Sequence, residues 1–562
     1  MPKNHGLTNE EVAKAFDKCG NVLKTAKYLG VARSTVHHHL DQLGIRPGKA
    51  LAGGSLDGDI KETVRDLPAE GTVKRYLLTC AQSNTYLNDN VWDTLLGIAK
   101  YYGAELHISR FSYNKGAYLN RGNLQKPGAF ETDEQDEDHA ITDDGAMWFD
   151  PRIVPYASDQ RLELAPGLVF CGELNILPTA VRPLSSLESY TGRKSSIVPH
   201  VKIAMESVAS SNSEPPKFMY TTGTVTFKNY IQKKAGQKAE FHHCYGALLV
   251  EVTSKGDWYV RQLNADRKGR IYDLGDRDDG VILFSGKEKP KFKQRVEAIN
   301  WGDIHVAEAL YDEEVIELNW GVGGMLDVLK PKYQFGHDTF SFLSRNHHDE
   351  KDSHRNFEKF INGEDNVATE LFKTGQFIVQ RMQRDWTKIV IVDSNHDRAL
   401  KKWLNVANYK TDPLNRMCFL RLELRQSEAI AVKDEHFHLL EYALENYGAV
   451  DPTVVKFLRE DEGFVICRDS SGGIQCGNHG HLGANGAKPA PLQFAKMGRR
   501  QNTGHTHSAC IIDGLFVAGV TGKPKRFKYR KGPSSWSQSD IVTYQNGKRQ
   551  IVTKWQNKYR AA

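Results

Sequence analysis

The segment 388–397, KIVIVDSNHD, joins a strand pattern to a cluster of polar residues. Residues 389–392 form a continuous apolar run, which is typical of a strand buried on both faces in an α/β protein. Asp393, Asn395, His396 and Asp397 follow at once, and such side chains bind metal ions or transfer protons. In the surrounding region, 296–562, other short strands that end in Asp, His or Asn alternate with helix-like stretches. The sequence therefore predicts an α/β fold here.

Four further segments of this region carry residues of the metal-binding types. Residues two apart in an extended backbone project to one side, so both members of a D-x-H or H-x-H pair can reach one metal centre. A mixture of carboxylate, imidazole and amide ligands suits manganese, iron or zinc rather than calcium. Two divalent cations about 3.5–4 Å apart can activate an attacking hydroxide and stabilise pentacoordinate phosphorus. The segments contribute Asp303 and His305, then Asp338, then His479 and His481, and finally His505 and His507.

The order of these motifs, D-x-H, D, N-H-D, H-G-H and G-H-x-H, resembles that of the calcineurin-like metallophosphoesterase superfamily over residues 296–520. The resemblance implies a four-layer αββα sandwich and two divalent metal ions, with Mn²⁺ preferred and Mg²⁺, Fe²⁺ or Zn²⁺ as alternatives. It also implies that His396 contacts the scissile phosphate and protonates or stabilises the leaving oxygen, while Asp397 orients His396. The implied ligands are Asp303, His305 and His507 for the first metal, Asp338 as a bridge, and Asn395, His479 and His505 for the second metal.

Two of the motifs depart from the pattern of the superfamily. His337 is inserted before Asp338, and Ser394 stands where the superfamily has a glycine. Both departures keep the ligand atom, so we expect an intact site. Either His479 or His481 can serve as the ligand of the fourth motif; His479 is preferred because it follows a predicted strand directly.

The composition is that of a globular protein with several domains. A length of 562 residues predicts roughly two to four domains, and 40% hydrophobic residues is ordinary. There is no apolar run of about 18 residues and no signal-peptide core, so we expect no membrane partner and a cytoplasmic protein, in the host cytoplasm if it is viral. The eight cysteines form no C-x-x-C pair, which favours free thiols. No internal repeat is visible.

Residues 7–45 read as three short helices of a domain predicted over 1–50, and residues 48–58 read as a flexible linker. Ala26, Gly30 and Val36 fit the small, left-handed and apolar positions of a helix-turn-helix, so we predict a DNA-binding domain. The alternative is a helical bundle for protein contacts. The predicted DNA-facing residues of the third helix are Arg33, Ser34, Thr35, His37, His38 and Gln42.

Two larger domains are predicted after this segment. Residues 70–290 form a mixed α/β domain of unknown role, with a hairpin at 245–263 and an exposed acidic loop or insertion at 131–144. Residues 296–562 form the phosphoesterase domain with a basic carboxyl-terminal extension. From residue 496 onward there are 14 Lys and Arg against two Asp, within a chain of net charge +6, which suggests a polyanionic partner. Phe527 and Tyr529 are interleaved with the cations and could stack on unpaired bases, and the predicted DNA-binding cations are Lys523, Lys525, Arg526, Lys528, Arg530 and Lys531.

Taken together, the sequence predicts a metal-dependent DNA nuclease that hydrolyses phosphodiester bonds by a two-metal mechanism. The arrangement is similar to the nucleases with which T5-like phages degrade host DNA and, more distantly, to nucleases that process double-strand breaks. We expect DNA as the partner and a homo-oligomer. The alternatives are a DNA-binding regulator on a phosphoesterase scaffold, and a phosphatase acting on phosphoproteins or small phosphomonoesters.

Overall fold

The computed structural model describes residues 6–19, 22–42, 62–113, 148–309, 312–346, 348–349, 351–469 and 472–561. The chain divides into two compact units, Met1–Lys61 and Glu62–Ala562. The predicted linker at 48–58 and the predicted acidic loop at 131–144 lie outside the described residues. No helix in the described part of the chain is both long enough and apolar enough to cross a membrane. Both helices and sheets are present, which confirms a mixed α/β protein.

The first unit contains the three predicted helices, α1 (Asn9–Cys19), α2 (Val22–Leu29) and α3 (Arg33–Gln42). Helix α1 begins with a capping box, in which the Glu11 amide donates to Thr8 Oγ1 (3.3 Å) and the Thr8 amide donates to Glu11 Oε2 (2.8 Å). Gly30 has a φ of +65° between α2 and α3. Ala26 and Val36 are buried, as predicted. The helices and their packing are confirmed, and their role in DNA binding stays a prediction.

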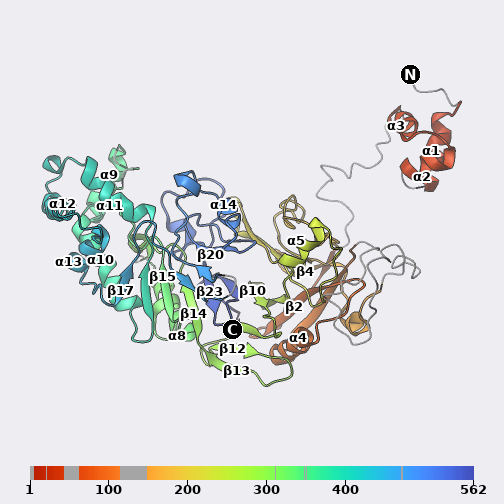
Figure 1. The fold of residues 1–562 in the computed structure, drawn as a ribbon, viewed down its shortest axis with the longest axis horizontal. Helices are drawn as coiled ribbons and strands as arrows, with labels where there is room; N and C mark the ends of the chain where they lie inside the picture. The colour runs from red at the N-terminus through yellow and green to blue at the C-terminus, as the bar shows by residue number, and fades with distance from the viewer. Residues whose placement is uncertain are drawn as a thin grey trace. The chain divides into compact units, whose positions relative to one another are not determined.

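The last part of the second unit is built on a six-stranded sheet of order β17-β16-β15-β14-β23-β24 (Figure 1). Strands β14 to β17 run parallel, and β23 and β24 join antiparallel beside β14. The apolar run at 389–392 is explained because both faces of β16 are covered. The strands are β14 (Val296–Asn300), β15 (Tyr333–Gly336), β16 (Lys388–Ile391), β17 (Val455–Phe457), β23 (Ser539–Tyr544) and β24 (Arg549–Thr553).

Helices cover the outer face of this sheet. Ile389 and Ile391 of β16 belong to one hydrophobic core with Leu371 of α10, Leu400 of α11 and Leu440 of α13. This core is the main source of stability for the region, because burial of apolar surface drives folding. The helices are α6 (Val306–Ala309), α7 (Glu313–Trp320), α8 (Met325–Leu329), α9 (Ser353–Asn362), α10 (Val367–Phe377), the π-helix η4 (Ile378–Met382), α11 (Asn395–Val406), η5 (Tyr409–Thr411), α12 (Arg416–Ala431) and α13 (Leu439–Gly448).

An eleven-stranded sheet of order β1-β4-β5-β6-β8-β7-β21-β22-β20-β19-β18 lies against the inner face. Phe335 and Val390 of the six-stranded sheet share a core with Ile466 and Ile474 of this larger sheet. The strands are β1 (Glu62–Val64), β4 (Arg161–Ala165), β5 (Leu168–Cys171), β6 (Ser195–Val198), β7 (Met205–Val208), β8 (Lys217–Thr221), β18 (Val465–Ile466), β19 (Ile474–Gln475), β20 (Arg500–Thr503), β21 (Cys510–Ile512) and β22 (Leu515–Val517).

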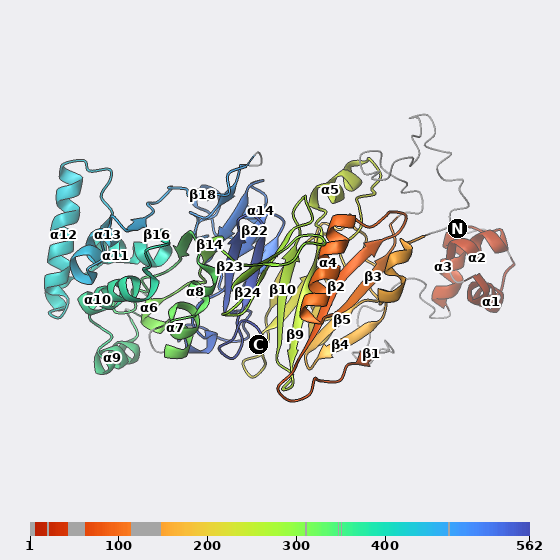
Figure 2. The ribbon, with the colours of Figure 1, turned by 90° about the horizontal axis from the view of Figure 1, so that it is seen from below.

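A four-stranded sheet of order β10-β9-β2-β3 packs on the other end of the larger sheet. Tyr76 and Val250 share a core there with Phe170 and Tyr220. Helix α4 (Asp89–Tyr102) covers the outer face (Figure 2). The strands are β2 (Val73–Gln82), β3 (Glu105–Phe111), β9 (Gly246–Thr253) and β10 (Trp258–Asn264), and the last two form the predicted hairpin. The remaining elements are η3 (Pro151–Tyr156), α5 (Lys234–His242), η6 (Ala484–Gly486), α14 (Pro491–Ala495), η7 (Pro524–Arg526) and a three-stranded sheet of β11 (Ile271–Leu274), β12 (Val281–Phe284) and β13 (Lys291–Gln294).

The second unit contains one strand arrangement twice, in a first half (62–264) and a second half (296–553). In the large sheet, the order β4-β5-β6-β8-β7 recurs as β18-β19-β20-β22-β21, with the same parallel and antiparallel steps. In the other layer, β10-β9-β2-β3 recurs as β24-β23-β14-β15.

The two halves meet through equivalent strands. β7 pairs antiparallel with β21, and β10 lies beside β24, where Gln550 Nε2 donates to Gln262 O (3.2 Å; Figure 2). The expectation of no internal repeat is therefore wrong for the topology. Strand order survives changes in side chains that remove any repeat from the sequence.

Candidate metal centre

Three parallel strands of the six-stranded sheet carry predicted site residues just beyond their carboxyl ends. Asp303 and His305 follow β14, Asp338 follows β15, and Asn395 and His396 begin the helix after β16. Ligands commonly bind at this edge of an α/β sheet, because the carboxyl ends of the strands and the amino termini of the following helices meet there and form a crevice.

The facing sheet delivers the other three predicted ligands. His479 follows β19, and His505 and His507 follow β20. Gly504 passes so close to Asp303 that a Cβ atom at this position would overlap the carboxylate. The glycine of the G-H-x-H motif is therefore required by this close approach.

Four of the residues form a tight buried group. One ligand atom from each of Asp303, His305, Asp338 and His507 lies within 4.8 Å of the others. His507 Nε2 is 3.1 Å from Asp303 Oδ2, and His305 Nε2 is 3.6 Å from Asp338 Oδ2. The group could hold a metal ion, since carboxylate and imidazole are the ligands expected of such a site.

A second group shares Asp338 with the first. Asp338 Oδ2 is 3.2 Å from His479 Nε2, and the same His479 nitrogen is 3.1 Å from Asn395 Oδ1. The His505 ring lies beside that of His479, with centroids 5.2 Å apart. One carboxylate oxygen thus stands between His305 of the first group and His479 of the second.

Four of the seven predicted ligands have left-handed backbone. The φ angles are +48° at His305, +44° at Asp338, +73° at His505 and +59° at His507. Each such residue costs on the order of 1–3 kcal/mol and persists where surrounding contacts fix it. His305 N donates to Asp338 O (2.8 Å), and His505 N donates to Asp303 Oδ2 (2.8 Å).

Burial and mutual charge set the protonation of the group. Burial, with the nearby His396, lowers the pKa of His305 to about 3. Burial would also lower the pKa of His479, but Asp338 and Asp303 outweigh it and raise that pKa to about 9. The charge of His479 in turn holds the pKa of Asp338 well below its usual range, against the effect of burial.

Several buried ligand atoms have no hydrogen-bond partner within the described residues. They are Asp303 Oδ1, Asp338 Oδ1, His305 Nδ1 and His507 Nδ1. A buried polar atom without a partner is costly, so it calls for a missing ligand. Coordination also needs ionised carboxylates and neutral imidazoles; the lowered pKa values of Asp338 and His305 fit this need, whereas His479, whose pKa is raised, would have to release a proton when a metal binds.

His396 lies beside the first group, and its predicted role at the scissile phosphate stays a prediction. Its Nδ1 donates to the carbonyl oxygen of Ser341 (2.6 Å), and its ring lies 4.7 Å from that of His305. Asp397 is buried with Oδ1 unpartnered, and its backbone amide donates to Ser394 Oγ (3.3 Å). The prediction that Asp397 orients His396 is wrong for this structure, because the Nδ1 atom of His396 donates to the Ser341 carbonyl and not to the Asp397 carboxylate.

The choice between His479 and His481 is informed by their contacts. Both ring nitrogens of His481 lack hydrogen-bond partners among the described residues, and its ring centroid is 5.5 Å from that of His479. His479 alone of the two has ligand-range contacts with Asp338 and Asn395. These contacts favour His479, and His481, whose buried ring nitrogens also lack partners, is the alternative ligand beside the second group.

Two neighbours of the centre were not assigned there from the sequence. His337 is fully buried, with Nδ1 3.4 Å from His479 Nδ1. The Tyr529 hydroxyl lies 3.4 Å from His305 Nε2. His337 was visible as an inserted residue next to Asp338, whereas nothing local in the sequence links Tyr529 to His305.

The basic segment 523–531 runs past the metal centre. Lys523 pairs with Asp312 (2.9 Å) and Glu314 (3.2 Å), and Lys528 pairs with Glu358. These two predicted DNA-binding cations are therefore engaged within the protein. Lys525, Arg526 and Lys531 are exposed, and Arg530 is half-buried.

The interleaved aromatic residues of this segment differ from each other. Phe527 is only 2% exposed and lies against His305, with ring centroids 5.5 Å apart. The expectation that Phe527 stacks on bases is wrong, because its ring belongs to the packing around the metal centre. Tyr529 is 42% exposed as a whole residue, and its ring contacts those of His305, His507, Phe527 and Trp536.

The predicted DNA-facing surface of α3 is largely exposed. Arg33, Ser34, His38 and Gln42 are exposed. Thr35 is 7% exposed and faces the small helical core, so its assignment to the surface is wrong. The side chain of His37 lies outside the described part of the structure.

The first half has a position that corresponds to the metal centre. An isolated parallel bridge joins Asp303 to Val520 in the second half, and the corresponding bridge of the first half joins Cys80 to Thr224. Cys80 therefore takes the place of Asp303.

The segments after β6 and β20 correspond in the same way. The strand register through the β7–β21 junction aligns His200 with His505 and Lys202 with His507. The H-x-H pair of the second half is thus replaced by an H-x-K pair. Lysine is a cation at neutral pH, so this exchange opposes metal binding.

The polar atoms of this first-half position have partners within the protein. Lys202 pairs with Asp513, and His200 Nδ1 accepts from the Lys202 amide (3.0 Å). Cys80 Sγ donates to Gly223 O (3.1 Å). Within the described ranges, the group of acids and histidines close enough to hold an ion is the one in the second half.

Comparison with known proteins identifies one similar protein over most of the chain. Protein A1 of Escherichia phage T5 is 39% identical over 491 residues, which are 85% of this chain and 81% of the relative. No family model matches the chain. No solved structure matches it.

Proposed function

The chain belongs to the same family as Protein A1 of Escherichia phage T5, and from this premise we propose that it is a metal-dependent nuclease that hydrolyses phosphodiester bonds of DNA during phage infection. The observation that carries the proposal is the position of Asp338 Oδ2, which lies 3.6 Å from His305 Nε2 and 3.2 Å from His479 Nε2. A carboxylate between two sets of imidazole and acid ligands is the arrangement that a pair of metal ions requires.

The proposed metal ligands are those of the two groups described above. Bound divalent ions, Mn²⁺ in this proposal, would stabilise the charge on the reacting phosphate and lower the pKa of the attacking water. The two facing sheets and the helices outside the six-stranded sheet support membership of the metallophosphoesterase superfamily and its αββα sandwich. One ion would use Asp303, His305, Asp338 and His507, and the other Asp338, Asn395, His479 and His505.

His396 is the proposed proton donor. Because its Nδ1 donates to the Ser341 carbonyl, its Nε2 is the atom left to face the substrate. In the protonated ring, Nε2–H can donate to the leaving oxygen and stabilise the charge that develops there. The carbonyl keeps the ring in place while the proton moves.

Two features support DNA as the substrate. The basic segment 523–531 passes the metal centre, and cations there favour a phosphate backbone. The three-helix unit at the amino terminus presents an exposed α3 surface with Arg33 and Gln42, as a helix-turn-helix does.

The test is incubation of the purified full chain with linear and circular DNA, with Mn²⁺, Mg²⁺ or a chelator. We expect cleavage with Mn²⁺ and none with the chelator. His396→Asn should slow cleavage by about 10²- to 10⁴-fold while bound metal stays unchanged. DNA that stays intact with every divalent metal would contradict the proposal. Rapid hydrolysis of a phosphomonoester would then favour a phosphatase, and DNA binding without any hydrolysis a regulator.

A further inference from the structure

A hollow of about 860 Å³ lies next to the metal centre; we call it the central hollow. His396 and Tyr529 line it, and both also touch His305 of the centre, through a ring contact at 4.7 Å and a hydroxyl contact at 3.4 Å. Its volume is at the upper end of the range for pockets that take one small ligand, about 300–1,000 Å³. A reacting phosphate and the nucleotides beside it can enter such a space.

The basic segment forms one wall of the central hollow and is held in place by ion pairs. Lys523 is tied to Asp312 and Glu314, and Lys528 is tied to Glu358. Between and beyond these anchors, Arg526 and Lys531 line the hollow. Their side chains make no hydrogen bond or ion pair with the described residues, so they are available for phosphates.

Tyr529 lies between these two cations in the sequence, lines the hollow, and is 42% exposed as a whole residue. Phe527 and Trp536 hold the ring from behind, with centroids 5.7 Å and 5.6 Å away. A ring fixed in this way loses little conformational entropy when a base stacks on it. Stacking on an aromatic ring requires an unpaired base, because paired bases are already stacked in a duplex.

Residues of the segment 341–364 also line the hollow, and several of them are acids. Asp349, Asp352 and Glu364 line the hollow together with Arg355, which is paired with Asp349 (3.8 Å) and with Glu358 (2.6 Å). A single backbone can follow the basic segment, whereas Asp352 and Glu364 add negative charge to the same hollow and disfavour a second backbone there. Like charges at close range disfavour that arrangement.

We propose that the central hollow binds an unpaired strand of DNA, with a base stacked on Tyr529 and backbone phosphates on Arg526 and Lys531. This inference rests on the proposed nuclease function and specifies its substrate: frayed or single-stranded DNA presented to the metal centre. The phosphate held by the two cations adjoins the one that reacts beside His396.

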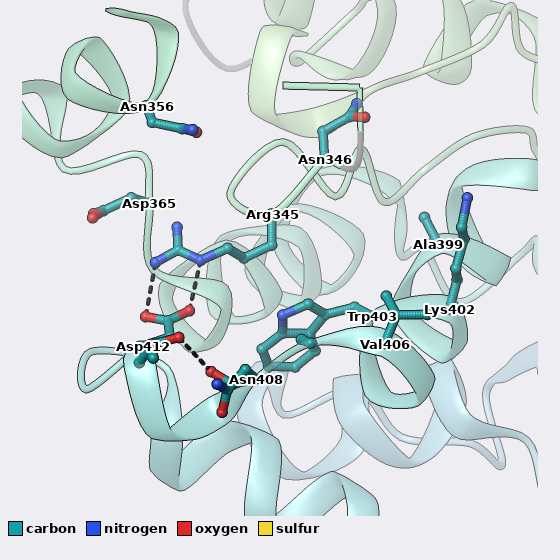
Figure 3. Close-up of a pocket in the computed structure, with 12 residues that line it drawn as sticks. Arg345, Asn346, Asn356, Asp365, Ala399, Lys402, Trp403, Val406, Asn408 and Asp412 are labelled. Atoms are coloured by element: carbon teal, nitrogen blue, oxygen red, sulfur yellow. Dashed lines mark hydrogen bonds and ion pairs between the residues drawn. The ribbon is translucent and has the colours of Figure 1, made fainter. Parts of the chain in front are cut away.

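A second hollow of about 360 Å³ shares Asn346 with the central hollow (Figure 3). Its arginine, Arg345, is engaged by Asp412 through two bonds of 2.7 Å and 2.9 Å, as Figure 3 shows. This ion pair gives Arg345 a structural role, and its neutralised guanidinium would bind a phosphate only weakly. The proposed strand site is therefore assigned to the central hollow alone, with Asn346 at its border.

The experiment measures binding of a labelled ten-nucleotide single strand and of a blunt hairpin duplex to the full chain, in chelator so that nothing is cleaved. We expect the single strand to bind more tightly. Tyr529→Ala should weaken single-strand binding by about 5- to 100-fold, as expected for one lost stacked base, while Tyr529→Phe stays near the wild type. Arg526→Ala and Lys531→Ala should each reduce the slope of log affinity against log salt by about 0.7.

Lys525→Ala is the matched control, since Lys525 is an exposed cation of the same segment that does not line the hollow. It should change the salt slope less than either lining cation. Equal affinity for the duplex, or an unchanged affinity in a folded Tyr529→Ala variant, would overturn the inference. Cleavage assays separate the two proposals: DNA cleavage with unaltered binding in Tyr529→Ala removes only the strand site. Tyr529-dependent binding without cleavage in any metal keeps the strand site and removes the nuclease.

Discussion

The two halves of the Glu62–Ala562 unit present the same strand order around two different centres. In the second half, buried atoms of Asp303 and Asp338 lack partners, and His305 and Asp338 adopt left-handed backbone. At the corresponding place in the first half, Cys80 and the H-x-K segment are satisfied by protein groups, and neither Cys80, His200 nor Lys202 has a positive φ.

Comparing the two centres separates two requirements for a metal site, which could not be told apart from one centre alone. The strand arrangement brings loop residues to one point, and both halves meet this requirement. A metal site additionally needs ligand atoms without hydrogen-bond partners in the protein, and often a left-handed backbone that costs conformational free energy. Among the described residues, only the centre of the second half meets this second requirement. Topology therefore locates a centre, and unpartnered side-chain atoms leave it able to hold a metal ion.

The largest expected effect comes from exchanging the matched pair Asp303 and Cys80. Asp303→Asn keeps the shape but removes the charge at the first proposed metal, so bound Mn²⁺ should fall and DNA cleavage should drop by at least about 10²-fold. Cys80→Ser at the equivalent position should leave both quantities at wild-type values. Metal content by atomic spectroscopy and cleavage rates measure the two. A loss of metal in Cys80→Ser would break the comparison by placing an ion in the first half.

An intermediate effect is expected from pH, through the packed interior of the first half. His243 Nδ1 accepts from the Tyr230 hydroxyl (2.6 Å) and Nε2 donates to Thr226 O (3.0 Å), an arrangement that only the neutral ring allows. Burial, with nearby Lys228, lowers the pKa of His243 from 6.5 to about 3. The unfolded chain therefore takes up the proton first, and stability is lost as pH falls from 6.5 towards 3.

Between pH 6.5 and pH 5 this loss amounts to about 2 kcal/mol from His243. His243→Gln should reduce the difference between urea unfolding free energies at pH 7 and pH 5 by that amount. The assay is run in chelator so that metal release from the second half does not contribute. An unchanged pH dependence in the variant would show that the first half is not the acid-sensitive one.

The smallest effect is expected from removing residues 1–42. The second unit is compact without them, so metal content should be unchanged. Loss of the exposed α3 cation Arg33 and its neighbours should weaken binding to duplex DNA by about 3- to 10-fold at physiological salt. Fluorescence anisotropy with a duplex measures this. If affinity is unaffected, the first unit serves protein contacts and both DNA contacts and chemistry belong to the second unit.

Local patterns were sufficient for much of the fold and the centre. The run KIVIVDSNHD predicted β16 and placed Asn395 and His396 after it, and the D-x-H and H-x-H spacings predicted which side chains would share a point. These predictions succeed because a strand and the loop that follows it are set by adjacent residues.

What could not be predicted depends on contacts between distant residues. Asp397 does not orient His396, because the hydrogen-bond partner of His396 Nδ1 is the Ser341 carbonyl. Tyr529 contacts His305 although the two residues are 224 positions apart in the sequence. Phe527, two residues before Tyr529, packs against the same histidine. The repeated strand order is equally invisible, since which strands pair is decided by tertiary packing and not by local propensity.

The pairing of β23 with β14 in the six-stranded sheet has a consequence for how the chain folds during translation. Asn300 pairs with Ile541, and Asp303 with Val520, so the aspartate of the first motif is held in place by residues synthesised more than 200 positions later. Chains grow at about 5–20 residues per second, so a nascent chain spends many seconds with Asp303 made and these partners absent. The centre therefore cannot assemble during translation until the residues of β23 have been synthesised.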